Sequence, residues 1–333
     1  MSGDAVELVV PGPPGDDGTD TARTIRLSNP DRLYFPDAPG PRGTGLTKLD
    51  LAEYYRAVGP GITAALDHRP TMLHRFPKGL AGPKVHQKKL PAGAPVWIET
   101  VGIYFPRYER IVDELCVTEL GAVLWAVQMS TVEFHPWNSR RSAVEFPDEW
   151  RIDLDPMPHC DLPRTRRVAR AAQDLLAELG IRGFPKTSGG HGLHIYVRIV
   201  AEWGFADVRR AARAFGRELT RRVPDDATVV WWRKDRDPSK VFVDFNQNAR
   251  DHTMAAAYSV RSTPRATVSA PLDWSEVDDA EPDDFTVATM PERFARRGDL
   301  FAPIELVAHR LDTLLEWAER DEAADDVVDP PSY

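Results

Sequence analysis

Residues 149–156 read E-W-R-I-D-L-D-P, which predicts a β-strand that carries two aspartates and ends at Pro156. In a β-strand residues i and i+2 share a face, so Asp153 and Asp155 point one way while Ile152 and Leu154 point into a core. Two carboxylates held this close repel each other unless a divalent cation lies between them. An isolated D-x-D pair is also common on protein surfaces, so the pattern alone leaves a solvated pair open.

A third carboxylate, Asp244, lies in V-F-V-D-F (241–245), among residues that favour buried strands. Three aspartates on strands can form an oxygen cage for two Mg²⁺ or Mn²⁺ ions, as in-line phosphoryl transfer requires. The alternative at this point is an ion pair between Asp244 and Arg233 or Arg236. The sequence therefore indicates a metal site and leaves a structural ion pair as its rival.

Residues 186–194 read K-T-S-G-G-H-G-L-H and run into the strand-like I-Y-V-R. Glycines let backbone amides approach an anion, while Ser188 adds a hydroxyl, and Lys186, His191 and His194 add positive charge. The stretch matches neither the G-x-x-x-x-G-K-[ST] loop nor G-x-G-x-x-G. It is a candidate triphosphate cradle, and the alternative is a tight turn between two strands.

Hydrophobic periodicity predicts the surrounding elements. Thr47 and Asp50 form a T-x-x-D start signal for a helix. Strands that alternate with long helices imply an α/β layer structure. We expect strands at 5–10, 24–27, 149–155, 193–199 and 240–245, and helices from 48 onward and at 118–130, 164–179 and 205–222.

The 333 residues suffice for about two domains. With 42 Lys and Arg against 51 Asp and Glu, the formal net charge is −9, which excludes a protein that coats nucleic acid by bulk charge. Residues 69–90 nevertheless contain six basic residues and no acid, whereas 316–333 suggest a solvated acidic tail. The two cysteines, the lack of an 18-residue apolar run and the absence of a signal-peptide pattern predict a soluble protein of the reducing cytoplasm.

With these residues placed, the chain from about 24 to 305 resembles the polymerase domain of bacterial ligase D. That family is a branch of the archaeo-eukaryotic primase superfamily. The segments that carry the resemblance occur in a fixed order. They are S-N-P-D-R-L-Y-F-P (28–36), L-T-K-L-D-L-A-E-Y-Y (46–55), H-R-F-P-K-G (74–79), H-Q-K-K-L-P (86–91), V-E-F-H-P-W-N-S-R (132–140), D-L-D-P (153–156), K-T-S-G-G-H-G-L-H-I-Y-V (186–197), V-F-V-D-F-N-Q-N (241–248) and A-A-Y-S-V-R (256–261).

The resemblance implies an α/β (α+β) protein with the primase fold: an RRM-like catalytic core built on an antiparallel sheet, with an N-terminal α/β module. We expect a strand and loop over 1–23, a DNA-contacting module over 24–130, a catalytic core over 131–305, and a C-terminal helix with an acidic tail over 306–333. With no room for ligase or nuclease domains, the chain is similar to a stand-alone version. Its implied location is the cytoplasm, in association with the nucleoid.

The resemblance also assigns residues, position by position. Asp153, Asp155 and Asp244 become the catalytic aspartates that hold two Mn²⁺ or Mg²⁺ ions. Arg32 and Lys48 become the site for a 5′-phosphate in gapped DNA. The nucleotide contacts become His135, Ser188, His191, His194, Gln247 and Arg261. The template contacts become Phe76, Lys84, His86 and Lys88, with Phe76 or His86 stacking on a base.

Two positions depart from the family pattern. His191 stands where many members have Lys or Arg, which makes a phosphate contact there weaker or pH-dependent. Thr263 replaces a second arginine two residues after Arg261. Both changes affect the phosphate site and leave the three aspartates intact.

The implied activity is primer extension and short-gap filling in DNA repair or non-homologous end joining, with a preference for ribonucleotides. Implied partners are gapped or primer-template DNA, NTP or dNTP, and repair proteins such as Ku or a separate ligase. A monomer with no membrane partner is expected. The rival functions are a metal-dependent nuclease, which would shorten a primer, and a non-catalytic module that binds gapped DNA.

Overall fold

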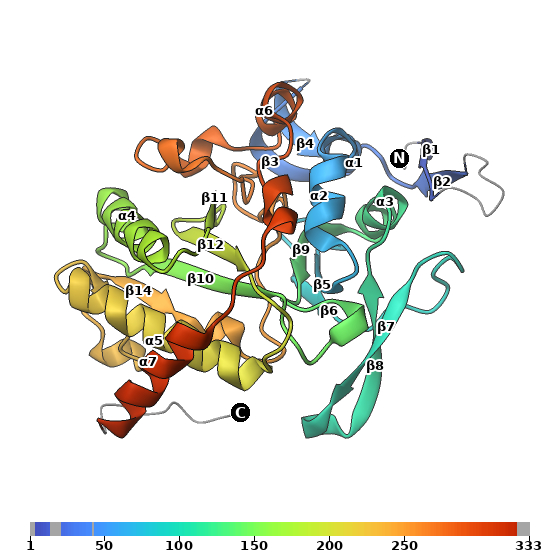
Figure 1. The fold of residues 1–333 in the computed structure, drawn as a ribbon. Coiled ribbons are helices and arrows are strands. Elements are labelled where there is room, and N and C mark those ends of the chain that lie inside the picture. Colours follow the sequence, from blue (N-terminus) through green and yellow to red (C-terminus); the bar gives the residue numbers. More distant parts are fainter. Residues whose placement is uncertain (1–3, 14–20, 42, 325–333) are drawn as a thin grey trace. The chain divides into compact units, whose positions relative to one another are not determined.

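The computed structural model describes residues 4–13, 21–41 and 43–324, and these residues pack as two compact units (Figure 1). Unit 1 takes its residues from Met1–Ser142, Thr253–Pro271 and Glu281–Ala302, and unit 2 from Ala143–His252, Leu272–Ala280 and Pro303–Tyr333. The first division between the packing units follows Ser142. The expected functional boundary between residues 130 and 131 stays a prediction.

Unit 2 is built on a five-stranded sheet in the order β11-β12-β10-β14-β13. Its pairs are antiparallel except for the parallel pair of β13 and β14. Helices α4, α5 and α7 complete the unit. The bounds are β10 Glu149–Pro156, α4 Leu162–Glu178, β11 Phe184–Thr187, β12 Leu193–Arg198, α5 Phe205–Arg222, β13 Ala227–Thr228, β14 Val241–Asp244 and α7 Asp312–Ala323.

One face of this sheet is apolar and is covered by helices. Trp150 of β10 packs edge-on against Phe215 of α5, with ring centroids 4.8 Å apart. Ile152 and Leu154 follow on the same face, since alternate residues of a strand share a side. Both are buried, and Figure 1 shows α4 and α5 beside the sheet strands. The polar residues between them are therefore directed to the opposite face.

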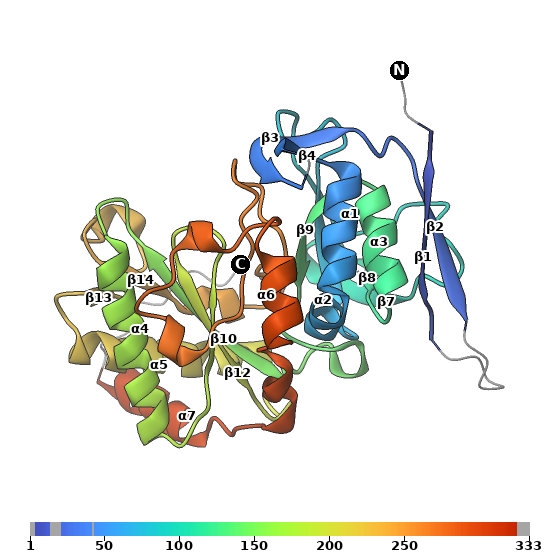
Figure 2. The same cartoon turned by 90° about the horizontal axis from the view of Figure 1, so that it is seen from above.

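Unit 1 contains a five-stranded sheet in which β5 pairs with β6, β8 and β9, and β8 pairs with β7. Helices α1 and α3 lie side by side against it (Figure 2). Two hairpins, β1–β2 and β3–β4, precede them. The bounds are β1 Val6–Pro11, β2 Ala22–Leu27, β3 Leu33–Gly40, β4 Gly43–Thr47, α1 Lys48–Ala57, α2 Gly59–Leu66, β5 Pro70–Arg75, β6 Val85–Gln87, β7 Thr100–Phe105, β8 Arg110–Cys116, α3 Leu120–Gln128, β9 Thr131–Pro136 and α6 Met290–Arg297.

Residues distant in sequence close unit 1 through hydrogen bonds. The hydroxyl of Tyr55 donates to the carbonyl of Val132 (2.6 Å) and accepts from the amide of Val260 (3.0 Å). Ser259 Oγ accepts from the amide of Phe134 (2.9 Å). These bonds tie the 253–271 segment to β9, which explains why it belongs to unit 1.

The expected strands match β1, β2, β10, β12 and β14, and the expected helices match α1, α3, α4 and α5. The five strands of the unit 1 sheet were not predicted. The Thr47 and Asp50 side chains form the expected capping box at the start of α1. Helix α7 lies within 306–333, where a C-terminal helix was expected, and it extends into the stretch expected as a solvated tail. Residues 325–333 of that tail lie outside the described residues. Within the described part of the chain, no helix is long and apolar enough to cross a membrane.

Candidate functional site

The polar face of the unit 2 sheet carries a row of ionisable side chains in strand register. Lys186 lies opposite His194, His194 opposite Asp153, and Asp153 opposite Asp244. Asp155 follows Asp153 by two residues and therefore joins the same face. Each aspartate offers one carboxylate oxygen, and these oxygens lie within 4.8 Å of one another. The three aspartates that the sequence singled out are thus brought together.

This donor set suits a divalent metal. Carboxylate oxygens are the ligands that Mg²⁺ and Mn²⁺ prefer, whereas three anionic groups at this spacing repel one another without a cation. Asp153 is buried, and Asp155 is exposed. A metal bound here would therefore touch both the protein interior and solvent.

Asp244 is oriented by the short helix that follows it. Its Oδ1 accepts from the amide of Asn246 (2.9 Å) and its Oδ2 from the side-chain amide of Gln247 (3.2 Å). Burial raises the pKa of Asp244, and these hydrogen bonds oppose that shift. The rival ion pair with Arg236 is not what the structure shows, because its guanidinium donates to the carbonyls of Val230 and Trp231 and lies over the ring of Phe242.

Behind the aspartates lies a buried lysine. Lys186 Nζ donates to His194 Nδ1 (2.7 Å), and Nε2 of the same ring lies 3.3 Å from Asp153 Oδ1. Lys186 is fully buried, with its ammonium 5.0 Å from the ring centroid of Tyr196. The sequence interpretation treated Lys186 as a cation of the phosphate loop. The structure corrects this, because Lys186 is a strand residue that fixes the His194 ring.

The glycine-rich loop is organised by Ser188. Its Oγ accepts from the amides of Gly190 (3.0 Å) and Gly192 (3.1 Å), and its own amide donates to the carbonyl of Gly192 (3.0 Å). Two amides that the sequence suggested for anion binding are therefore engaged within the loop. His191 is exposed at its tip.

A second polar cluster lies in unit 1, around Glu133 of β9. Its Oε2 accepts from His135 Nε2 and from His74 Nδ1, both at 2.8 Å, and lies 3.6 Å from Arg261 Nε. Burial lowers the pKa of His135 to about 3, although Glu133 opposes the shift. Burial alone would raise the pKa of Glu133, but the bonds from His135 and His74 and the charge of Arg261 hold it well below its usual range. Of this cluster, the sequence predicted His135 and Arg261.

Arg32 and Lys48 lie together at the start of α1. The amide of Lys48 donates to the carbonyl of Arg32 (2.8 Å). Lys48 Nζ donates to the Ser28 carbonyl (2.9 Å) and to Gln128 Oε1 (2.8 Å), and its side chain is buried. Burial and the nearby charge of Arg32 lower the pKa of Lys48 to about 8.

The predicted template contacts occupy different environments. Phe76 is buried, which favours the exposed His86 as the aromatic of this pair that offers a stacking surface. His86 lies opposite His74, with ring centroids 4.5 Å apart. Lys84 is exposed, and the ammonium of Lys88 lies 4.9 Å from the ring centroid of Phe105.

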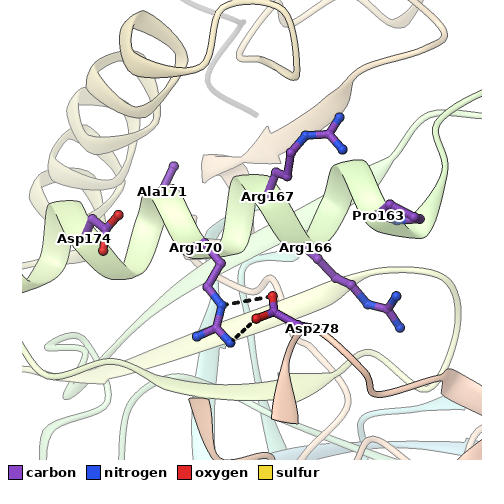
Figure 3. Close-up of a pocket in the computed structure, with 7 residues that line it drawn as sticks. All are labelled: Pro163, Arg166, Arg167, Arg170, Ala171, Asp174 and Asp278. Atoms are coloured by element: carbon purple, nitrogen blue, oxygen red, sulfur yellow. Dashed lines mark hydrogen bonds and ion pairs between the residues drawn. The ribbon is translucent and has the colours of Figure 1, made fainter. Parts of the chain in front are cut away.

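A hollow of about 460 Å³ on α4 lies outside these clusters (Figure 3). Figure 3 shows Arg170 directed at Asp278. The Nε of Arg170 donates to Oδ1 of Asp278 (3.1 Å) and its Nη2 donates to Oδ2 (2.7 Å). Arg166 donates to the Ala280 carbonyl (2.8 Å), and Arg167 pairs with Asp226 (2.8 Å). These arginines serve to join segments of unit 2.

Sequence reasoning missed two residues of these clusters and one contact. Glu133 and His74 lie within quoted motifs, and the i, i+2 spacing of Glu133 and His135 in a strand places them on one face. The side-chain amide of Gln247 donates to Asp244, a contact that the sequence did not predict, and its nucleotide contact stays a prediction. The contact between Glu133 and His74 depends on the register of β5 and β9, which places the two residues opposite each other.

Comparison with known proteins gives a consistent result. Residues 47–301 match the family described as LigD, primase-polymerase domain. The chain is 31% identical over 271 residues to the multifunctional non-homologous end joining protein LigD of Pseudomonas aeruginosa, covering 81% of this chain and 31% of that protein. It is 28% identical over 315 residues to LigD of Mycobacterium tuberculosis, covering 92% and 40%. The chain thus spans 31% and 40% of the length of these two relatives.

The solved polymerase domain of Mycobacterium tuberculosis Ligase D, in complex with DNA, matches with a TM-score of 0.74 at 28% identity, covering 84% of this chain and 98% of that one. The family match and the fold together define a DNA-directed nucleotidyltransferase of the primase-polymerase class. More specifically, the chain belongs to the LigD primase-polymerase domain family. The expected primase-polymerase fold is thereby confirmed.

Proposed function

We propose that this protein extends a primer 3′-hydroxyl opposite a DNA template and fills short gaps. The observation that carries this proposal is the cluster of Asp153, Asp155 and Asp244 on one polar sheet face. Family membership supports it independently. In the reaction the primer 3′-oxygen loses its proton and bonds to the α-phosphorus of the nucleotide. The bond between that phosphorus and the oxygen that bridges to the β-phosphate breaks, and pyrophosphate leaves.

The three carboxylates would hold two Mn²⁺ or Mg²⁺ ions, which when bound lower the pKa of the primer hydroxyl and stabilise the leaving pyrophosphate. The chain's own groups set up this site. Gln247 and the Asn246 amide orient Asp244, and the Lys186–His194 pair orients Asp153. Orientation of this kind reduces the reorganisation that charge development otherwise requires.

The remaining assignments are parts of the same proposal. Ser188, His191, His194, His135 and Arg261 serve nucleotide binding. Arg32 and Lys48 serve the downstream 5′-phosphate, supported by their proximity. Phe76, Lys84, His86 and Lys88 serve the template, with the exposure of Lys84 and His86 in their favour.

The end-joining relatives support a role in that repair pathway. The family resemblance further implies a preference for ribonucleotides, action on nucleoid DNA, and Ku or a separate ligase as partners. We propose each of these for this chain, which we expect to act as a monomer.

A primer-extension assay tests the activity directly. Labelled primer-template and gaps of several lengths are incubated with Mn²⁺ or Mg²⁺ and with NTPs and dNTPs in parallel. We expect lengthening, with NTPs used in preference to dNTPs and gaps with a 5′-phosphate in preference to gaps without one. Shortening of the primer would indicate the nuclease instead, and DNA binding without any turnover would indicate a binding module.

A further inference from the structure

The Glu133 side chain is the centre of a buried network in unit 1. Its Oε2 receives the ring nitrogens of His74 and His135, both at 2.8 Å. Its Oε1 receives the amide (2.8 Å) and the hydroxyl (2.5 Å) of Ser262. Arg261 precedes Ser262, and its Nε lies 3.6 Å from Oε2. One carboxylate thus joins β5, β9 and the segment that carries Arg261.

This arrangement fixes proton positions. An ionised carboxylate only accepts hydrogen bonds, so the ring nitrogens that face Glu133 must carry protons. The Nε2 proton of His135 is therefore committed to Glu133, and the ring cannot flip without losing that bond. The plane of the His135 ring is also fixed, because the His74 ring packs against its face with ring centroids 3.8 Å apart.

We propose that Glu133 is a positioning residue for triphosphate binding, which holds His135 and Arg261 in the orientation that the phosphates require. This inference rests on the proposed function, in which both residues contact the nucleotide. Glu133 itself does not touch the substrate, because only 2% of it is exposed and its charge would repel phosphate. Its effect is exerted through its hydrogen-bonded neighbours.

The same three groups, His74, Glu133 and His135, also have a spacing that can suit a metal ion. Two observations favour the hydrogen-bonded network. Both imidazoles converge on a single carboxylate oxygen at ordinary hydrogen-bond distance. The Arg261 guanidinium lies beside that same oxygen, and a divalent cation placed there would meet a like charge.

The test replaces Glu133 with glutamine, which has the same shape but turns one acceptor oxygen into a donor. We expect the KM for NTP to rise about 10- to 100-fold, the effect of losing a charge-assisted hydrogen bond. We expect kcat and the Kd for primer-template to change less than about 2-fold, because the lost contacts bind the triphosphate equally in the ground and transition states and the three aspartates lie outside this network. Glu145→Gln is the matched control, since that carboxylate is exposed and paired with Arg250 (2.7 Å).

Two further measurements separate positioning from a merely structural role. Inorganic tripolyphosphate, used as a competitive inhibitor, should lose affinity for Glu133→Gln as NTP does. In a His135→Ala background, Glu133→Gln should raise the KM for NTP by less than about 3-fold. Both changes remove the same hydrogen bond between Glu133 and His135, so the second change has less left to remove. Fully additive effects, or equal losses in kcat, NTP affinity and DNA affinity, would overturn the inference.

Ser262→Ala covers the case in which Glu133→Gln does not fold. It removes one hydroxyl contact to Oε1, and we expect a KM increase of about 2- to 5-fold, from one lost hydrogen bond. An unchanged KM in this variant counts against the proposal. Binding of tripolyphosphate, measured by calorimetry without turnover, tests the positioning role of Glu133 separately from the proposed polymerase activity. A wild-type protein that does not extend primers, yet binds tripolyphosphate more tightly than Glu133→Gln, refutes the proposed function and leaves the positioning role standing.

Discussion

Asp153 shows how a single residue combines structural and chemical roles. It lies opposite His194 on one neighbouring strand and Asp244 on the other, so its position is fixed from both sides. The Lys186–His194 pair approaches one of its oxygens. A buried carboxylate in this position is costly unless its charge is balanced, and a bound divalent cation would supply that balance.

Asp153→Ala should separate binding from chemistry. We expect primer extension to fall by roughly 100- to 1000-fold or more, because the loss removes a charged group that the reaction needs. The Kd for gapped DNA should change less than about 2-fold, since the phosphate contacts remain. Extension assays and fluorescence anisotropy measure the two quantities. Asp174→Ala, an exposed aspartate on α4, is the control. Retained extension in Asp153→Ala would refute the metal assignment.

The pKa of Lys48 predicts how 5′-phosphate recognition depends on pH. Because that pKa lies near 8 in place of 10.5, the ammonium is protonated below pH 8 and loses its proton above it. A phosphate monoester is already a dianion above about pH 7. We therefore expect the preference for gapped DNA with a 5′-phosphate to be greatest near pH 7 and to decline by pH 9.5.

The affinity ratio of phosphorylated to unphosphorylated gaps, measured at both pH values, checks this expectation. Lys48→Met should lower the ratio at pH 7 and abolish most of its pH dependence. A ratio that stays constant in the wild-type protein would remove Lys48 from the phosphate site.

At the level of elements, the loop between β11 and β12 depends on close approach to a neighbouring strand. A Cβ on Gly192 would lie 2.6 Å from the Leu154 carbonyl oxygen and 3.4 Å from Pro156 Cδ. A Cβ on Gly190 would meet only Ser188 Oγ, at 3.4 Å, which is ordinary contact. A side chain is therefore sterically excluded at position 192 and accommodated at position 190.

Gly192→Ala should displace the loop from β10, whereas Gly190→Ala should be tolerated. We expect Gly192→Ala to reduce the free energy of unfolding by about 1–3 kcal/mol, as steric overpacking does, and to raise the KM for NTP. Gly190→Ala should have little effect on either the free energy of unfolding or the KM for NTP. Denaturant unfolding and steady-state kinetics provide the comparison, and equal behaviour of the two variants would contradict this account of the loop.

At the scale of the whole molecule, the net charge of −9 is unevenly distributed. In unit 2 many acids are paired with arginines of the helices, such as Glu322 with Arg210 and Asp321 with Arg221. In unit 1 the basic stretch 69–90 contains no acid. We therefore expect nucleic acid to be bound through local cations, so that net charge is a poor guide to DNA binding.

Local phosphate contacts predict a salt dependence that individual lysines control. Lys84→Ala should weaken template binding and reduce the slope of log K against log salt by about 1. Arg296→Ala on α6, an exposed cation paired with Glu292, should leave the slope unchanged. Titrations of primer-template at several salt concentrations measure both. Identical slopes for wild type and Lys84→Ala would exclude a phosphate contact at Lys84.

Local sequence patterns identified the three aspartates, four of the helices and several strands, but not the strands of the unit 1 sheet. Alternation placed Asp153 and Asp155 on one face, and the capping box located α1, because these signals act within a few residues. The tertiary structure decided which side chains meet. Strand register set Asp153 between His194 and Asp244, buried Lys186 as a support for His194, and brought His74 to Glu133. Such contacts join residues far apart in the chain, and the register that aligns them depends on which strands pair, which a local pattern does not specify.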